Sequence, residues 1–313
     1  MLDLATRGET GKDQWETILT TQFSQKGFLI KQRSKPTGLY RKLRRRLSVT
    51  PLRKPVLWLR HHGFRPEDVF LGSYPRSGQT WSRFVLYEIL TGKEGGFDEV
   101  NGSIHLIADH ATGASLLPGG GRLIATHERH WRGYHKAIFL VRDARDVILS
   151  EFAFTTALEY FHGDLDSFIH TFLRKRISAY GPWQDHVNSW LDSRISGTPN
   201  LLVVRFEDLR QDPFQRFKEM AQFLGVNPDP GLIHRAIAHN SLEKMREKEQ
   251  VAPQRASVKG RFVRSGSVQG WVNKLSAEQV RLIEQYAGAA LQRLGYALSS
   301  SVAPLQTDHT MLT

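Results

Sequence analysis

A loop of polar and small residues between positions 74 and 81 has the composition of a phosphate-binding site. It reads Tyr-Pro-Arg-Ser-Gly-Gln-Thr-Trp and lies between a predicted strand, Val69 to Tyr74, and an apolar helical pattern, Ser82 to Leu90. Main-chain N–H groups at the start of a helix are unpaired and lie at the positive end of its dipole, so they attract an anion. The side chains of Arg76, Ser77 and Thr80 add donors there. We therefore expect this loop to bind a phosphate.

The spacing of the loop does not fit the nucleotide-binding motif G-x-x-x-x-G-K-[ST]. Five residues separate Gly72 from Gly78 instead of four, and Gln79 occupies the position of the required Lys. The loop instead resembles Y-P-K-S-G-T-T-W, with which sulfotransferases bind the 5′-phosphate of 3′-phosphoadenosine 5′-phosphosulfate (PAPS). The resemblance implies that this nucleotide is bound by Arg76, Ser77, Gly78, Gln79, Thr80 and Trp81.

A second predicted strand and helix carry residues for another phosphate. The short apolar run before Arg142 predicts a buried strand, and the residues after it follow helical spacing as far as Ser150. The segment resembles the sulfotransferase signature V-x-R-N-P-K-D-x-x-x-S, which implies that Arg142 and Ser150 clamp the 3′-phosphate. Asp143 and Arg145 depart from the Asn and Lys of that signature. Without the resemblance, Arg142 could be a surface partner of Asp143 or Asp146, although an Arg that ends a strand is better placed for a ligand.

The late segment 261–271 looks like the sulfotransferase loop R-K-G-x-x-G-x-W. The resemblance implies that Phe262 and Val263 border the adenine and that the 3′-phosphate is covered by Arg264, Ser265 and Gly266. Ser265 replaces the usual Lys, so one cationic contact is lost. Trp271 has a structural interpretation as well, because a Trp between polar residues often anchors a loop.

The segment 201–213 is similar to the turn Y-E-D-L-x-x-D-P that follows a central strand in the same family. Phe206 stands where the family has Tyr, so stacking on the adenine would survive without a hydroxyl contact. Asn240, Ser241 and Leu242 replace the Thr-Ser-Phe of the family. The four similar segments occur in the family's order and span residues 68–272.

The acceptor side of the site is predicted at the end of a third strand, after Thr126. The segment lies where sulfotransferases have K-T-H, which implies that His127 removes the proton of the acceptor hydroxyl. Imidazole suits this role because its unperturbed pKa of about 6.5 leaves it mostly neutral near pH 7. Ala125 replaces the Lys, and Glu128 is an alternative base. The other nearby histidines are interpreted as structural: His105, His110, His130 and His135.

The resemblance implies in-line transfer of a sulfuryl group from PAPS, with 3′-phosphoadenosine 5′-phosphate (PAP) as product. Such a transfer depends on positioning and electrostatic stabilisation. Arg76 would neutralise charge on the departing phosphate, Thr80 and Ser150 would donate hydroxyl groups, and His127 would act as the base. No metal site is predicted, because the chain has no Cys and no H-E-x-x-H. Two alternatives stay open: a P-loop-type nucleotide phosphotransferase, and a nucleotide-binding protein without catalysis.

Alternating strands and helices predict an α/β fold with a parallel sheet flanked by helices on both faces and a P-loop-like nucleotide-binding core. The predicted strands are Val69 to Tyr74, Leu123 to Thr126, Ile138 to Arg142 and Leu201 to Phe206. The longest predicted helices are Asp166 to Tyr180, Gln211 to Leu224 and Ala277 to Leu294. We divide the chain into a basic extension (1–66), a sulfotransferase domain (67–298) and a C-terminal tail (299–313).

Basic residues are concentrated near the N-terminus. Residues 17–66 contain 13 Lys or Arg and no Asp or Glu, which exceeds the formal net charge of +12 of the whole chain. The segment could recruit an anionic acceptor or surface, or it could be a solvated extension; nucleic acid is the weaker expectation. The sequence has no signal-peptide pattern and no transmembrane segment, so we expect a cytoplasmic enzyme. The expected acceptor is a small molecule, a lipid or a glycan, and we expect loops 94–118 and 160–165 to shape its pocket.

Overall fold

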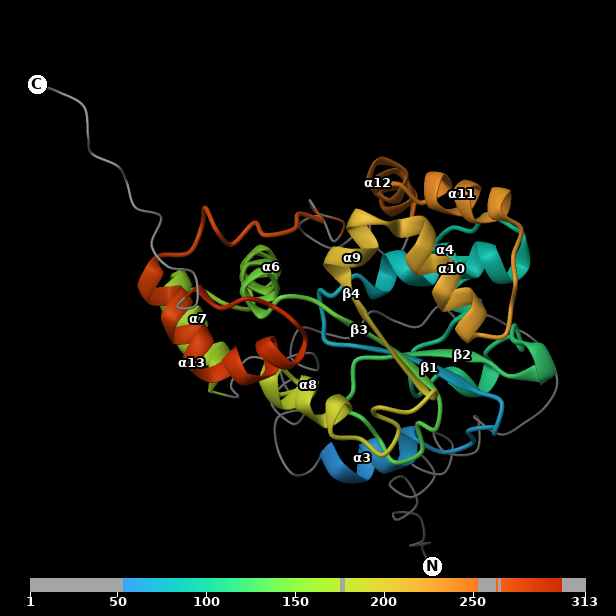
Figure 1. The fold of residues 1–313 in the computed structure, drawn as a ribbon, viewed down its shortest axis with the longest axis horizontal. Helices are drawn as coiled ribbons and strands as arrows, with labels where there is room; N and C mark the ends of the chain where they lie inside the picture. The colour runs from blue at the N-terminus through green and yellow to red at the C-terminus, as the bar shows by residue number, and fades with distance from the viewer. Residues whose placement is uncertain (1–52, 175–177, 253–262, 264–265, 300–313) are drawn as a thin grey trace, which may run out of the picture. The chain divides into compact units, whose positions relative to one another are not determined.

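The computed structural model describes residues 53–174, 178–252, 263 and 266–299 (Figure 1). Four strands form a parallel sheet in the order β2-β1-β3-β4. The strands are β1 (Val69–Ser73), β2 (Leu123–Thr126), β3 (Ala137–Val141) and β4 (Leu201–Arg205). Each lies within one residue of its predicted boundaries, and the predicted parallel sheet is confirmed.

Helices cover both faces of the sheet because successive strand residues point to opposite sides. Phe70 packs with α6 (Ala144–Ala157), α7 (Leu165–Leu173), α8 (Trp183–Leu191) and α13 (Ala277–Arg293). Leu71 packs on the other face with α4 (Gln79–Thr91), α10 (Pro213–Phe223) and α11 (Pro230–His239). The other helices of the described residues are α3 (Arg53–Arg60), α5 (Phe97–Ser103), α9 (Phe206–Gln211), α12 (Leu242–Val251) and the 3-10 turns η1 (His110–Thr112) and η2 (Pro118–Gly120).

Two predicted helices have different boundaries in the structure. The helix predicted to reach Tyr180 ends at Leu173, and the chain turns at Gly181, whose φ is 80°, before α8. The helix predicted from Gln211 is divided at Asp212, because Asp212 caps α10 through the N–H of Gln215 and is followed by a proline. The helix predicted from Ala277 to Leu294 is confirmed as α13 within one residue.

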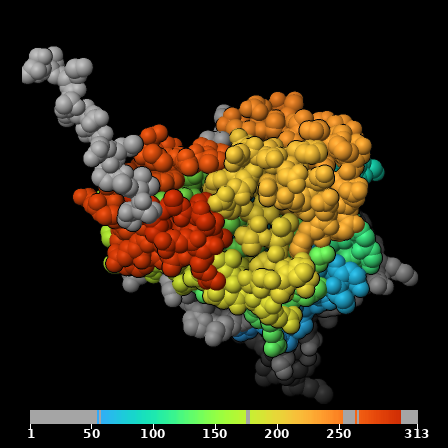
Figure 2. All heavy atoms as spheres, viewed as in Figure 1, coloured from blue at the N-terminus to red at the C-terminus, as the bar shows by residue number. Residues whose placement is uncertain are grey.

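The order of the strands brings the predicted site residues to one edge of the sheet. The chain passes from β1 to β2 on one side and returns to β3 on the other, so β1 and β3 flank a switch point at their carboxyl ends. Ligands of open parallel sheets bind at such a point. The loop after β1 and Arg142 after β3 both lie there. Figure 2 shows residues after β4 (yellow and orange) beside the C-terminal part (red) on the visible surface.

No helix among the described residues is both long enough and apolar enough to cross a membrane. Most of the basic extension (1–66) and nearly all of the tail (299–313) lie outside the described residues.

Candidate functional site

The loop after β1 is built around two residues with left-handed backbone. Arg76 has φ 71° and Gly78 has φ 87°, so the chain turns sharply into the first turn of α4. A Cβ atom on Gly78 would lie 2.6 Å from the ring of Phe206. Glycine is therefore required at position 78 both for its backbone angle and for the close approach of that ring.

Arg76 joins this loop to the segment after β3. Its Nε donates to the hydroxyl of Ser150 at 3.1 Å, and its guanidinium carbon lies 4.7 Å from the ring centroid of Phe154. Its carbonyl oxygen accepts a hydrogen bond from Arg142 at 3.1 Å. The residues predicted for the 5′-phosphate and those predicted for the 3′-phosphate are thus in direct contact.

Arg142 is buried and lies over Phe206, with its guanidinium carbon 4.7 Å from the ring centroid. It also donates to the carbonyl of Ser267 at 2.7 Å and lies 3.9 Å from a carboxylate oxygen of Asp146. Burial lowers the pKa of Arg142, and the nearby Asp146 carboxylate offsets only part of this shift. Asp146 is therefore a partner, as the alternative interpretation proposed, but the pair is buried and not on the surface.

One buried donor of the cavity lining has no hydrogen-bond partner among the described residues: the Nε of Arg142. Buried polar atoms are usually hydrogen-bonded, so unpaired donors beside a cavity indicate a ligand with acceptor atoms. A nucleotide phosphate provides such atoms. The free Nε of Arg142 therefore fits the predicted ligand.

A cavity of about 380 Å³ contains most of the predicted site residues. Those that line it are Arg76, Gly78, Gln79, Thr80, Trp81, His127, Arg142, Ser150, Phe206, Val263 and Gly266. Ser77 is fully buried and does not line the cavity. Phe262, Arg264 and Ser265 lie outside the described residues.

The side chain of Gln79 is directed away from the nucleotide position. Its amide donates to the carbonyls of Leu71 and Thr126, each at 2.9 Å, and so ties β1 to β2 below the loop. We therefore expect Gln79 to contact the nucleotide through its main-chain N–H alone. Trp81 packs edge-on against Phe217 and forms one wall of the cavity.

His127 is the only histidine among the described residues that line the cavity. Its Nδ1 lies 3.0 Å from the carbonyl oxygen of Ser73. A carbonyl oxygen only accepts, so Nδ1 carries the proton and Nε2 carries the lone pair that a base needs. Burial lowers the pKa of His127 to about 4, well below the 6.5 expected from the sequence. The imidazole is therefore neutral at pH 7.

The alternative base, Glu128, is buried and is not among the residues that line the cavity. Its main-chain N–H donates to the hydroxyl of Thr126, and its carbonyl accepts from His186 at 3.0 Å. Each of the four histidines interpreted as structural has a hydrogen bond elsewhere: His105 to Gly102, His110 to His62, His130 to Tyr134 and His135 to Pro66.

The motifs do not predict several residues that line the same cavity: Glu151, Phe154, Tyr180, Arg210 and Met245. Helical spacing could have found Phe154 and Arg210, because they lie four residues after Ser150 and Phe206 and therefore on the same helix faces. Loops 94–118 and 160–165, expected to shape the acceptor pocket, contribute no described residue to the lining.

Comparison with known proteins identifies the family. Residues 120–295 match the sequence model of the sulfotransferase domain, which is more than half of the chain. The chain belongs to the sulfotransferase family. The match includes His127, Arg142, Ser150 and Phe206 but begins after the loop that follows β1. As a sulfotransferase, the protein transfers a sulfuryl group.

Two animal sulfotransferases represent the relatives in sequence. Mouse sulfotransferase 1B1 is 27% identical over 249 residues, which cover 71% of this chain and 82% of that protein. The zebrafish (Danio rerio) protein cytosolic sulfotransferase 1 is 25% identical over 239 residues, which cover 69% of this chain and 79% of that protein.

Solved structures confirm the sulfotransferase fold. Retinol dehydratase in complex with retinol and PAP matches with a TM-score of 0.61 and 20% identity, over 76% of this chain and 86% of that one. A mouse sulfotransferase in complex with PAP matches with a TM-score of 0.58 and 22% identity, over 75% of this chain and 91% of that one.

Proposed function

We propose that this sulfotransferase uses PAPS as donor and transfers its sulfuryl group to a hydroxyl group, or an amine, of an acceptor. One observation carries the proposal: the loop after β1, the Arg after β3 and His127 after β2 line a single cavity, and Arg76 links that loop to Arg142 and Ser150. The PAP named in the two structural matches supports the choice of nucleotide.

The first turn of α4 and Arg76 would bind the 5′-phosphate, and Arg142, Ser150 and Gly266 the 3′-phosphate, with Arg264 and Ser265 completing that contact. PAPS supplies the reacting sulfuryl group when it is bound. Arg76 is a permanent cation and would offset charge on the departing phosphate, assisted by the hydroxyls of Thr80 and Ser150. His127, with its lone pair on Nε2, would take the acceptor proton.

The acceptor is proposed to be a small molecule, a lipid or a glycan. Retinol and androsterone, named in two complexes of retinol dehydratase, are small apolar alcohols. Tyr180 beside His127 and Phe154 beside Arg76 give this cavity aromatic walls, which suits an apolar acceptor. We further propose a cytoplasmic location, which the name of the zebrafish relative supports, and we retain the division into 1–66, 67–298 and 299–313.

We expect the wild-type protein to bind PAP more tightly than AMP and to transfer labelled sulfate from PAPS to at least one alcohol or phenol. The 3′-phosphate distinguishes PAP from AMP, and Arg142 can make charge-assisted hydrogen bonds to it. Calorimetry with both nucleotides and a panel of acceptors measure the two properties. Discrimination without transfer would indicate a nucleotide-binding protein. Equal affinity for PAP and AMP, with transfer of phosphate in place of sulfate, would favour a phosphotransferase.

We also propose that residues 17–66 recruit an anionic acceptor or surface. Neutralising Arg44, Arg45 and Arg46 together is then expected to raise KM for the acceptor at low salt and to leave the Kd of PAP unchanged, because the attraction is electrostatic and screened by salt. Steady-state kinetics at two ionic strengths measure the effect. As a control, three exposed Arg in other parts of the chain are neutralised: Arg194, Arg235 and Arg281. Equal KM values for both triple variants at low salt would support the solvated-extension interpretation.

A further inference from the structure

The carboxylate of Asp146 is enclosed by the main chain of residues 266–271, which we call the late loop. Asp146 lies in the first turn of α6 and is 3% exposed. Its Oδ1 accepts the N–H of Trp271 at 3.0 Å, and the carboxylate also accepts the N–H of Gln269. Gln269 has φ 55°, and a Cβ atom on Gly270 would lie 2.9 Å from the hydroxyl of Ser267 and 3.5 Å from Oδ1. Residues 269–271 therefore wrap closely around a buried anion.

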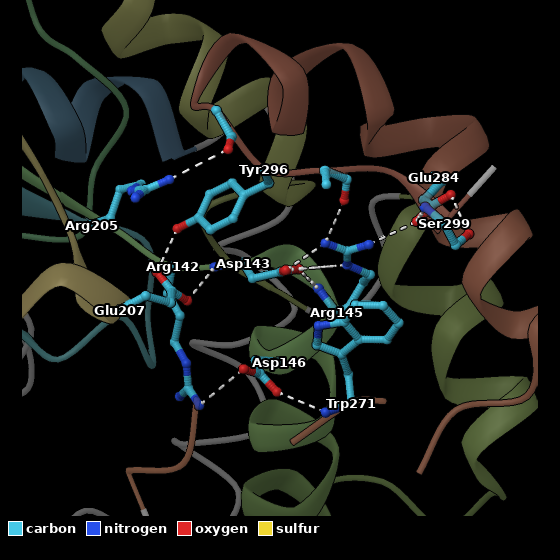
Figure 3. Close-up of polar contacts among 12 residues, drawn as sticks. Arg142, Asp143, Arg145, Asp146, Arg205, Glu207, Trp271, Glu284, Tyr296 and Ser299 are labelled. Atoms are coloured by element: carbon cyan, nitrogen blue, oxygen red, sulfur yellow. Dashed lines mark hydrogen bonds and ion pairs between the residues drawn. The ribbon is translucent and has the colours of Figure 1, made fainter. Parts of the chain in front are cut away.

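The same carboxylate faces the predicted 3′-phosphate clamp. Figure 3 shows Asp146 between Arg142 on one side and Trp271 on the other. Arg142 itself donates to the carbonyl of Ser267. The late loop is thus held at Ser267 by Arg142 and at residues 269–271 by Asp146.

Trp271 fixes the far end of the late loop on the same helix. The guanidinium carbon of Arg145 lies 3.9 Å from the ring centroid of Trp271 (Figure 3). Arg145 is in turn held by Asp143 at 2.6 Å and by Glu284 at 2.8 Å. Trp271 is therefore an anchor, and its position is set by side chains of α6, the helix that also carries Ser150.

Three groups would meet at the 3′-phosphate: Arg142, Ser150 and the late loop. All three are positioned by the N-terminal part of α6 or lie in it or directly before it. Holding a loop in its binding conformation before the ligand arrives lowers the entropy cost of binding. We propose that Asp146 is a positioning residue for the 3′-phosphate: it fixes the late loop, which carries Gly266, against Arg142. This inference rests on the proposed donor nucleotide.

Charge alone predicts the opposite effect. A carboxylate 3.9 Å from Arg142 repels a phosphate that binds to the same guanidinium. If Asp146 acted only through its charge, removing it would tighten the binding of PAP. If Asp146 acts by positioning the loop, removing it weakens the binding of PAP. The direction of the change therefore separates the two roles.

The experiment compares the Kd of PAP with the Kd of AMP in wild-type protein and in Asp146→Ala. We expect the Kd of PAP to rise about tenfold and the Kd of AMP to change less than twofold, because AMP lacks the phosphate that the late loop contacts. Asp146→Asn is expected to stay within about threefold of wild type, because its side-chain oxygen can still accept the N–H of Trp271. In kinetics, KM for PAPS is expected to rise in Asp146→Ala while kcat at saturation is retained.

Two further variants keep the test decisive. Gly270→Ala adds a methyl group between the late loop and the Asp146 carboxylate and leaves Arg142 unchanged. It is therefore expected to reduce the discrimination between PAP and AMP, as Asp146→Ala does. Asp212→Asn is the control, because Asp212 also accepts a main-chain N–H but caps α10 outside the cavity. Unchanged or tighter PAP binding in Asp146→Ala and Gly270→Ala, with wild-type discrimination intact, would overturn the role of Asp146 alone. Absence of discrimination in the wild type would overturn the proposed nucleotide as well.

Discussion

His127→Ala is expected to lower kcat by about 10²-fold or more while the Kd of PAP changes less than twofold. General-base catalysis contributes about 10² to 10⁴ to the rate, and His127 is not assigned a phosphate contact. The hydrogen bond from Nδ1 to Ser73 leaves Nε2 as the basic atom, and the side chain lines the cavity. Steady-state kinetics with an aliphatic alcohol and calorimetry with PAP measure the two quantities. A phenol, which ionises more easily, is expected to depend less on the base.

Two variants test whether the loss belongs to His127. His130→Ala is the matched control, because His130 is nearby and is hydrogen-bonded to the carbonyl of Tyr134 outside the cavity; its kcat is expected to stay within a few-fold of wild type. Glu128→Gln tests the alternative base. Full activity in His127→Ala together with an inactive Glu128→Gln would assign the proton transfer to the carboxylate.

The pH profile alone does not identify the base. A histidine base with its ordinary pKa gives an acidic limb at about pH 6 to 7, but burial lowers the pKa of His127 to about 4. A base must be deprotonated, so activity is expected to be flat from neutral pH down to about 5 and to fall near 4. A carboxylate with its ordinary pKa would give a limb in the same range. Substitution is therefore required to separate His127 from Glu128.

Acid unfolding overlaps with this limb. His186 of α8 is fully buried against the residues that follow β2, and burial lowers its pKa to about 3. An unfolded histidine takes up a proton near pH 6.5, whereas His127 and His186 do not until pH 4 and below. The unfolded state therefore binds more protons in this window, and stability falls as the pH is lowered through it. Activity below pH 5 is interpreted only after unfolding has been measured at the same pH.

The sequence predicted the sheet and the edge where the site lies because short apolar runs and the polar residues after them are local signals. Arg142, Ser150 and His127 could be placed by the motifs that follow those strands. The orientation of Gln79 could not, because it depends on the carbonyls of Leu71 and Thr126, which only the assembled sheet brings together.

The helix boundaries show the limit of periodicity. Residues up to Tyr180 continue a helical pattern, yet α7 ends at Leu173. The contacts that position the late loop beside Arg142 could not be predicted either. Asp146 and Gly270 are 124 positions apart in the sequence and meet only through the packing of the late loop on α6. Pairings at such separation leave no periodic signal in a single sequence.

Arg142→Ala is expected to raise the Kd of PAP by about 10²-fold and the Kd of AMP by less than about threefold. A hydrogen bond to a charged group contributes about 1.5 to 3 kcal/mol, and a hundredfold change in Kd corresponds to about 2.7 kcal/mol. The Nε of Arg142 is buried without a partner among the described residues, so it remains available to a phosphate. The small effect on AMP comes from the lost hydrogen bond to the carbonyl of Arg76.

Arg142→Lys separates charge from geometry, and Arg205→Ala is the matched control. Lys retains the positive charge but lacks the planar guanidinium, so it cannot bind a phosphate and also donate to the carbonyls of Arg76 and Ser267. Arg142→Lys is therefore expected to bind PAP more tightly than Arg142→Ala but more weakly than the wild type. Arg205 also ends a strand at this edge, but it pairs with Asp208 at 2.7 Å and is not among the residues that line the nucleotide cavity. Calorimetry with PAP and AMP measures all three variants. If Arg142→Ala kept the wild-type ratio of the two Kd values, Arg142 would not contact the 3′-phosphate, and its buried guanidinium would serve only to join the loops after β1 and before α13.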